Sequence, residues 1–137
     1  MQRRKAREFV LSALYQREFL DTELETLLEE VNPGDQAGYI TGTYRGILDR
    51  QPEIDRMIGE RTVGWRFERL ALIDRNILRI GVYELLFSDE VPAEVAMDEA
   101  IELAKTFGTE QARSFVNGIL DRIWHDAKEQ EDVAREA

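Results

Sequence analysis

The sequence contains no cysteine and only one histidine, His125, among its 137 residues. Without cysteine the chain has no disulfide framework, no thiolate nucleophile and no cysteine-ligated metal site. A zinc site that lacks cysteine typically needs several histidine or carboxylate ligands, and one histidine does not supply the HExxH arrangement. We therefore interpret His125 as a surface residue and predict no bound metal and no cofactor.

The chain also lacks the short motifs of common catalytic sites. It has no glycine-rich phosphate loop, no GxSxG elbow and no dinucleotide-binding fingerprint. Carboxylate pairs such as Asp98 and Glu102 are present, but the pattern places them on a solvated helix face, where no perturbed pKa is expected. We predict no catalytic residues and a protein that is not an enzyme.

Long apolar runs are absent as well. No run approaches the roughly 20 residues that a membrane-spanning helix needs, and the basic N-terminus leads into an amphipathic stretch without the apolar core of a signal peptide. We expect a cytoplasmic protein that does not enter a membrane. With 43% apolar and 34% charged residues, the composition is typical of folded protein, and we predict a single domain over residues 1–137.

Apolar residues recur with a helical period along nearly the whole chain, and no convincing alternating strand is present. We therefore predict an all-α fold. The expected helices cover residues 3–20, 22–31, 35–50, 53–60, 65–87, 92–107 and about 110–127. They divide the domain into an N-terminal helical half, about 1–64, and a C-terminal helical half, about 65–130. The charged tail at 128–137 is expected to fray.

The predicted helix 65–87 is apolar on almost every side, which is typical of a helix that is buried all round. We expect it to be the central helix of the fold. Its polar and small positions form two sets, with Asp74, Gly81 and Glu84 beside Ile77 in one arc, and Arg75 and Arg79 on another side. We interpret each set first as a source of salt bridges to neighbouring helices.

Three glycines, Gly38, Gly42 and Gly46, recur at intervals of four within the predicted helix 35–50. Glycine in a helix costs about 0.5–1 kcal/mol relative to alanine, so a stripe of three requires a reason. Small residues on one helix face let a second backbone approach closely. We predict a tight helix crossing along this stripe, either within the chain or between two copies in a homodimer.

The basic residues are unevenly distributed. The formal net charge is -10, yet residues 2–7 hold four of the eighteen lysines and arginines and no acid. These four are Arg3, Arg4, Lys5 and Arg7. Because most of an acidic surface repels phosphate, a nucleic-acid contact has to be local, and this cluster can supply one with a salt-dependent affinity. A solubilising terminus explains the charge distribution equally well.

Three stretches, RRKAREFVLSALYQ, WRFERLALIDRNILRIGVYELLF and VPAEVAMDEAIELAKTFGTEQARSFVNGILDRI, follow one another in the order and spacing of the NusB family. From residue 3 to about residue 123 the chain resembles this family of bacterial transcription antitermination factors, most weakly between 20 and 60. The resemblance implies about seven helices in two helical bundles around a shared long central helix, without catalytic activity.

The resemblance also implies partners. Proteins of this kind bind the boxA element of ribosomal RNA leader transcripts, a single-stranded RNA, together with NusE, a small-subunit ribosomal protein. The complex joins NusA, NusG and RNA polymerase, suppresses premature termination and aids ribosomal RNA synthesis and maturation. By similarity, RNA contacts map onto Arg3, Arg4, Lys5, Arg7, Arg113, Phe115 and Asn117. Phe115 either stacks on an unpaired base or belongs to the core.

The surface expected to meet NusE is the arc of Asp74, Ile77, Gly81 and Glu84, whose carboxylates would complement a basic protein. Three other positions carry less positive charge than the family pattern, namely Glu94, Asp98 and Ser114. We therefore predict that the free protein binds RNA weakly and that NusE supplies much of the cationic surface. Two other functions stay open: a helical protein-protein adaptor without RNA binding, and the NusB-like RNA-binding domain of a ribosomal RNA methyltransferase.

Overall fold

The computed structural model describes residues 1–62, 64 and 66–136, and within them every regular element is helical. The elements in chain order are α1 (Arg3–Arg17), α2 (Leu24–Glu29), the 3-10 turn Gly34–Gln36, α3 (Ala37–Asp49), α4 (Gln51–Gly59), the 3-10 turn Phe67–Arg69, α5 (Leu72–Leu86), α6 (Ala93–Phe107) and α7 (Ala112–Glu136). The prediction of an all-α fold with about seven helices is confirmed.

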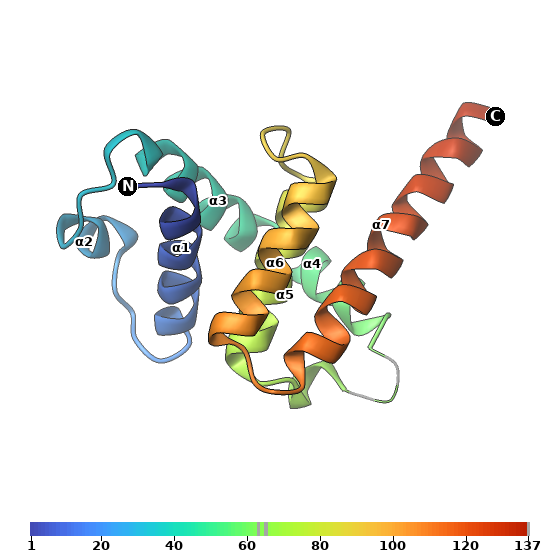
Figure 1. Cartoon of the computed structure of the whole chain (residues 1–137), viewed down its shortest axis with the longest axis horizontal. Coiled ribbons are helices and arrows are strands. Elements are labelled where there is room, and N and C mark those ends of the chain that lie inside the picture. The colour runs from blue at the N-terminus through green and yellow to red at the C-terminus, as the bar shows by residue number, and fades with distance from the viewer. Residues whose placement is uncertain (63, 65, 137) are drawn as a thin grey trace.

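Helix α5 is the shared element of the fold. It packs against α1 and α3 on one side and against α6 and α7 on another, and α4 also contacts it. Figure 1 shows α1, α2 and α3 gathered on one side of the α5–α6 pair and α7 on the other. Because its apolar side chains point in all directions, α5 has ten buried residues, among them Ile77, Leu78 and Ile80. Two bundles around a central helix are therefore confirmed.

The central helix is shorter than the pattern predicts. Before Leu72 the chain forms the turn Phe67–Arg69, and Leu70 and Ala71 are extended, with ψ angles of 140° and 143°. The side chain of Arg75 folds back and donates hydrogen bonds to the backbone carbonyls of Leu70, at 3.0 Å, and Glu68. No proline or glycine lies between Arg66 and Leu72, and these hydrogen bonds from Arg75 hold the segment at the start of the helix. The predicted start at Trp65 lies outside the described residues.

Within the chain, two of the three members of the predicted glycine stripe face no second helix, whereas the alternative of a contact between two copies in a homodimer stays a prediction. A Cβ atom built on Gly38 or Gly42 meets no other atom within 4 Å, and both positions are exposed. Only Gly46 faces a close neighbour, the ring of Tyr83 on α5. The tight crossing lies elsewhere: a Cβ on Gly81 would approach a methyl group of Leu120 at 2.8 Å, so α5 and α7 come together there.

Helix α7 extends past the rest of the molecule (Figure 1). The tail expected to fray is helical as far as Glu136, with exposed side chains after Ala127. Its last turns are held by local ion pairs, such as that between Arg135 and Glu131 at 2.8 Å. Among the described residues, no helix is both long and apolar enough to cross a membrane.

Candidate functional site

The basic residues at the start of α1 occupy one corner of the molecule, and they differ in access to solvent. Lys5 and Arg4 are exposed, with 74% and 61% of their side chains accessible, and Arg3 is partly exposed. Arg7 is only 3% accessible. We call Arg3, Arg4, Lys5 and Arg7 the basic corner. Of its four cations, three reach the surface and one belongs to the interior.

Arg7 is part of a buried ion pair. Its Nε and Nη2 atoms donate to the two carboxylate oxygens of Glu84 on α5, at 2.6 and 3.0 Å, and the hydroxyl of Tyr39 donates to the same carboxylate at 3.2 Å. Burial is the largest single influence and opposes the charged form of Arg7, yet the hydrogen bonds to Glu84 together with the charges of Glu84 and Glu99 outweigh it and raise the pKa of Arg7. The expectation that Arg7 contacts phosphate is therefore wrong, because its guanidinium is enclosed.

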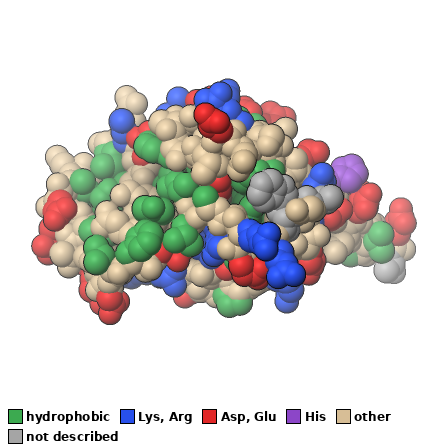
Figure 2. All heavy atoms as spheres, turned by 90° about the horizontal axis from the view of Figure 1, so that it is seen from below, with side chains coloured by type: hydrophobic (Ala, Val, Ile, Leu, Met, Phe, Trp, Pro, Cys, Tyr) green, Lys and Arg blue, Asp and Glu red, His purple; other side chains and the backbone are tan. Residues whose placement is uncertain are grey.

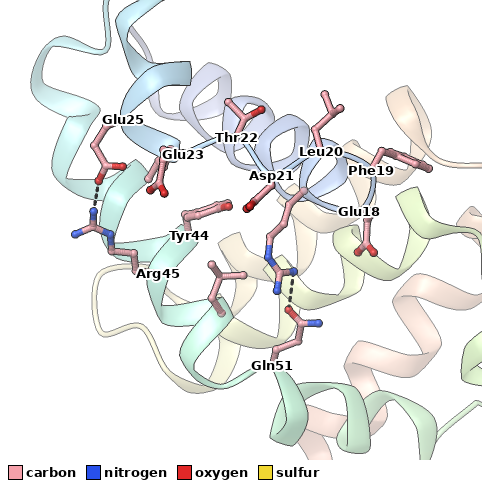
Figure 3. A pocket seen from close by; sticks show the side chains of 13 residues that line it. Glu18, Phe19, Leu20, Asp21, Thr22, Glu23, Glu25, Tyr44, Arg45 and Gln51 are labelled. Atoms are coloured by element: carbon pink, nitrogen blue, oxygen red, sulfur yellow. Dashed lines mark hydrogen bonds and ion pairs between the residues drawn. The ribbon is translucent and has the colours of Figure 1, made fainter.

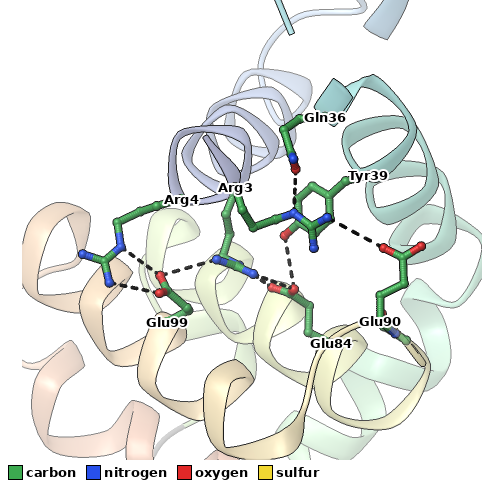
Figure 4. Close-up of polar contacts among 9 residues, drawn as sticks. Arg3, Arg4, Gln36, Tyr39, Glu84, Glu90 and Glu99 are labelled. Atoms are coloured by element: carbon green, nitrogen blue, oxygen red, sulfur yellow. Dashed lines mark hydrogen bonds and ion pairs between the residues drawn. The ribbon is translucent and has the colours of Figure 1, made fainter. Parts of the chain in front are cut away.

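The three outer cations are also paired with acids, and Figure 4 shows the pairs of Arg3 and Arg4. Arg4 holds the carboxylate of Glu99 on α6 through two hydrogen bonds, from Nε at 3.2 Å and from Nη2 at 3.0 Å. Lys5 lies 3.2 Å from the carboxylate of Glu8. Arg3 lies 3.9 Å from Glu90, donates to Gln36 at 2.6 Å and stacks over the ring of Tyr39 at 4.1 Å. The corner is thus a network between helices and not a free basic arm.

The predicted surface for NusE is not at the surface. Asp74, Ile77, Gly81 and Glu84 are all buried. Glu84 pairs with Arg7, and Asp74 accepts hydrogen bonds from the backbone N–H and the hydroxyl of Thr109, at 3.0 and 2.6 Å. Both carboxylates therefore hold α5 against its neighbours, which agrees with the first interpretation of these polar positions.

The second polar set on α5 forms the predicted salt bridges at one of its two positions. Arg79 is buried and donates to both oxygens of Asp55 on α4, at 2.8 and 3.0 Å, and to Glu18 just after α1, at 3.0 Å. The predicted salt bridge from Arg79 to neighbouring helices is confirmed. Arg75 instead binds the backbone carbonyls before α5.

The candidate RNA residues on α7 lie far from the basic corner in Figure 1, where α7 begins at the opposite end of the bundle from the start of α1. Arg113 and Asn117 are exposed, while Phe115 is half-buried and packs against the core. Phe115 lines a cavity of about 230 Å³ between the end of α4 and α7, beside Arg122. The structure therefore does not unite the two predicted sets of RNA contacts.

Several positions singled out in the sequence lie on the surface. Glu94, Asp98 and Ser114 are exposed, so the reduced positive charge there faces solvent. His125 is also exposed, 3.5 Å from Glu129. In the part of the chain that the structure describes, no three histidine, aspartate or glutamate side chains are grouped as a metal site would require.

An exposed aromatic segment follows the end of α1, and sequence reasoning missed it. Phe19 and Leu20 are 61% and 58% exposed, and Tyr15 contacts Phe19 edge-on, with ring centroids 5.2 Å apart. Figure 2 shows hydrophobic side chains gathered on the underside of the molecule. The sequence contains a signal for this exposed segment. Phe19 and Leu20 are large apolar residues that stand directly before Asp21, at the gap between the predicted helices 3–20 and 22–31.

Beside this segment lies an open cavity of about 700 Å³ between the end of α1, α2 and α3 (Figure 3). Its floor contains the buried side chains of Leu24 and Tyr44. Burial raises the pKa of Tyr44. The charged residues that line the cavity are Glu18, Asp21, Glu23, Glu25, Arg17 and Arg45. With four acids against two arginines, the rim is acidic.

Comparison with known proteins gives consistent matches. The model of the NusB family matches residues 4–125. The transcription antitermination protein NusB of Pseudothermotoga lettingae is 42% identical over 125 residues, which cover 88% of this chain and 89% of that protein. The NusB protein of Bacillus subtilis is 38% identical over 130 residues, covering 94% and 99%.

Solved structures show the same similarity. NusB of T. maritima superimposes with a TM-score of 0.81 at 44% identity, covering 91% of this chain and 92% of that one. A crystal structure of the antitermination factors NusB and NusE in complex with double-stranded RNA contains a chain that matches with a TM-score of 0.77 at 27% identity, covering 92% and 99%.

Proposed function

This chain belongs to the NusB family, and we propose from that premise that it is a transcription antitermination factor. It binds the boxA RNA of ribosomal RNA leader transcripts together with NusE, in the cytoplasm. In the larger complex it joins NusA, NusG and RNA polymerase. The chain covers most of the length of its relatives, and these relatives are themselves antitermination proteins. Both facts favour this function over that of a domain in a ribosomal RNA methyltransferase.

The observation that carries the RNA-binding proposal is the basic corner. Arg3, Arg4 and Lys5 reach solvent from a single turn of α1 on an otherwise acidic protein. Exposed lysine and arginine side chains gathered on one turn offer phosphate contacts at one place, whereas the remaining acidic surface repels phosphate. The RNA contact is therefore local, and it is made by three cations and not by four.

The corner also supports a need for NusE. Its four cations are paired with four carboxylates, from Glu8, Glu84, Glu90 and Glu99, so the formal charges of these side chains cancel. The exposed acids at Glu94 and Asp98 on α6 lower the local potential further. A partner that brings its own cations would make the complex, and not the free chain, the effective RNA reader.

For NusE we propose a new docking surface in place of the buried arc on α5. The segment around Phe19 and Leu20 exposes aromatic and aliphatic area, and aromatic side chains are enriched in the cores of protein interfaces. The acidic rim of the adjoining cavity complements a basic ribosomal protein. Both features lie on one side of the molecule and together form a surface suited to NusE.

Binding assays with labelled boxA RNA, with and without NusE, test this proposal. In the R4Q/K5Q variant the slope of log affinity against log salt should flatten by about 1.4, at about 0.7 per single-strand phosphate contact. The matched variant F19S should weaken NusE binding and leave that slope unchanged once NusE is saturating. If the wild-type chain with NusE binds no RNA, the protein is a helical adaptor instead.

A further inference from the structure

The carboxylate of Glu99 lies between two arginines of the basic corner (Figure 4). Arg4 grips it with Nε at 3.2 Å and Nη2 at 3.0 Å, and Nη1 of Arg7 lies 3.4 Å from the same carboxylate. The side chain of Glu99 is 17% accessible, against 61% for Arg4. An acid from α6 thus occupies the hydrogen-bonding edge of an otherwise exposed guanidinium on α1.

This arrangement matters because carboxylates and phosphates use the same site on arginine. Both accept two parallel N–H hydrogen bonds from the planar fork of a guanidinium. In this chain Glu99 already accepts the two bonds from Nε and Nη2 of Arg4. The pKa of Arg4 is raised, first by its hydrogen bond to Glu99 and then by the charge of that carboxylate. A phosphate that approaches Arg4 through this edge has to replace Glu99.

Glu99 does not become an unpaired charge when Arg4 leaves it. Arg7 stays beside it, because Arg7 is held on its other edge by two hydrogen bonds to Glu84. Leaving a partly buried carboxylate without a partner would be costly, but here Arg7 keeps a cation next to Glu99. Arg4 can therefore change partners with only a rearrangement of one exposed side chain.

We propose that Glu99 competes with RNA phosphate for Arg4, and so sets how much additional binding energy an RNA must bring before the basic corner engages it. The proposal rests on the RNA-binding function above and identifies a specificity-determining residue within it. An RNA held only by the corner has to replace Glu99 without help. An RNA held also by NusE engages Arg4 while its other contacts persist. The carboxylate thereby discriminates against RNA that lacks the second set of contacts.

The test compares E99Q with D98N, since each removes one negative charge from neighbouring positions of α6. Asp98 is exposed and makes no ion pair with a described residue. With a labelled single-stranded RNA that carries boxA, measured by fluorescence anisotropy at one fixed salt concentration, E99Q should bind about three- to tenfold more tightly than wild type. D98N should bind less than about twofold more tightly, because solvent and salt screen an unpaired surface charge.

A double-mutant cycle with R4Q separates competition from general electrostatics. In the R4Q background, E99Q should improve RNA binding no more than D98N does, because no guanidinium is released. Thermal unfolding monitored by circular dichroism confirms that each variant is folded.

Equal effects of E99Q and D98N would overturn the inference, as would a full gain from E99Q in the R4Q background. Both results leave the proposed function intact, because RNA is still bound. Absence of RNA binding by wild type with NusE would refute the proposed function itself, and the inference with it. The gain from E99Q should also be larger for the free protein than for its complex with NusE.

Discussion

The buried pair between Arg7 and Glu84 makes a sharp prediction about stability. Substitution R7M removes the guanidinium but keeps a long side chain that packs beside Val10 and Leu11, which are also buried. The carboxylate of Glu84 would lose both of its hydrogen bonds from Arg7, at 2.6 and 3.0 Å, and keep that from Tyr39. A buried charge then stays without its counter-ion, which is the costly outcome for such pairs.

The expected loss is about 3–5 kcal/mol in the free energy of unfolding, the range for breaking a buried ion pair on one side. At roughly 3 °C per kcal/mol for a domain of this size, the melting temperature should fall by about 10–15 °C. The matched control is K5M, which removes one cation from the same turn of α1. Because Lys5 is 74% accessible, K5M should cost less than about 0.5 kcal/mol.

Urea denaturation followed by circular dichroism measures both variants, with the midpoint and slope compared at neutral pH. A second substitution tests the cause: in R7M/E84L the uncompensated charge is gone, so much of the lost stability should return. If R7M is no more destabilising than K5M, Arg7 is not enclosed as the structure shows, and its assignment to the interior is refuted. In that case Arg7 would again be a candidate for phosphate binding.

Two further substitutions test packing and pH dependence. G42A should raise the free energy of unfolding by about 0.5–1 kcal/mol, because a Cβ atom at this position is unobstructed. G46A should give no such gain, because its Cβ atom would collide with the ring of Tyr83. Equal gains for the two variants in urea denaturation would contradict the close contact between Gly46 and Tyr83. Burial, followed by the charge of Glu84, raises the pKa of Tyr39, so the folded state favours the protonated phenol. Its contribution to stability is complete below the unfolded-state pKa of about 10 and is lost as the pH rises above it. Stability should therefore fall less steeply above this pH in Y39F than in wild type, and identical declines would argue against the shift.

The sequence is sufficient to predict the fold to a large extent. The helical period identifies the seven α-helices found in the described residues, and the apolar surface of residues 72–86 correctly marks the central one. Boundaries are less predictable. The extended residues before Leu72 carry no helix breaker, and hydrogen bonds from the side chain of Arg75 to the backbone carbonyls of Leu70 and Glu68 hold this segment. Contacts between a side chain and the backbone leave no periodic signal.

The position of Arg7 was within reach of the sequence. It precedes Val10, Leu11 and Leu14 by three, four and seven residues, and all three are buried, so Arg7 lies on the apolar face of α1. Composition alone suggests a cluster of four equivalent cations, because it ignores this register. The identity of its partner, Glu84, was not predictable, since 77 residues separate the two in the chain.

The polar residues of α5 show why the expected partner surface was wrong. The polar pattern alone favours salt bridges to neighbouring helices, and only the resemblance to the family leads to the expectation of an exposed arc for NusE. In the structure each one is satisfied by a different neighbour: Asp74 by the segment between α6 and α7, Arg79 by α4 and the end of α1, and Glu84 by α1. We infer that these contacts help to specify which helices pack around α5 and at which position along its axis.

The buried contacts of α5 also position the candidate RNA site. Glu84 fixes Arg7, Arg7 lies beside Glu99, and Glu99 holds Arg4, so a chain of charged contacts runs from the interior of the protein to the surface. The basic corner is therefore built by α1, α5 and α6 together, although all four cations come from one short stretch of sequence. A flexible basic arm pays an entropic cost when it becomes ordered on RNA. A basic corner held by three helices is already ordered when the protein folds, so much of that entropic cost does not arise on RNA binding. The specificity of the corner for RNA therefore depends on the acids that share its arginines.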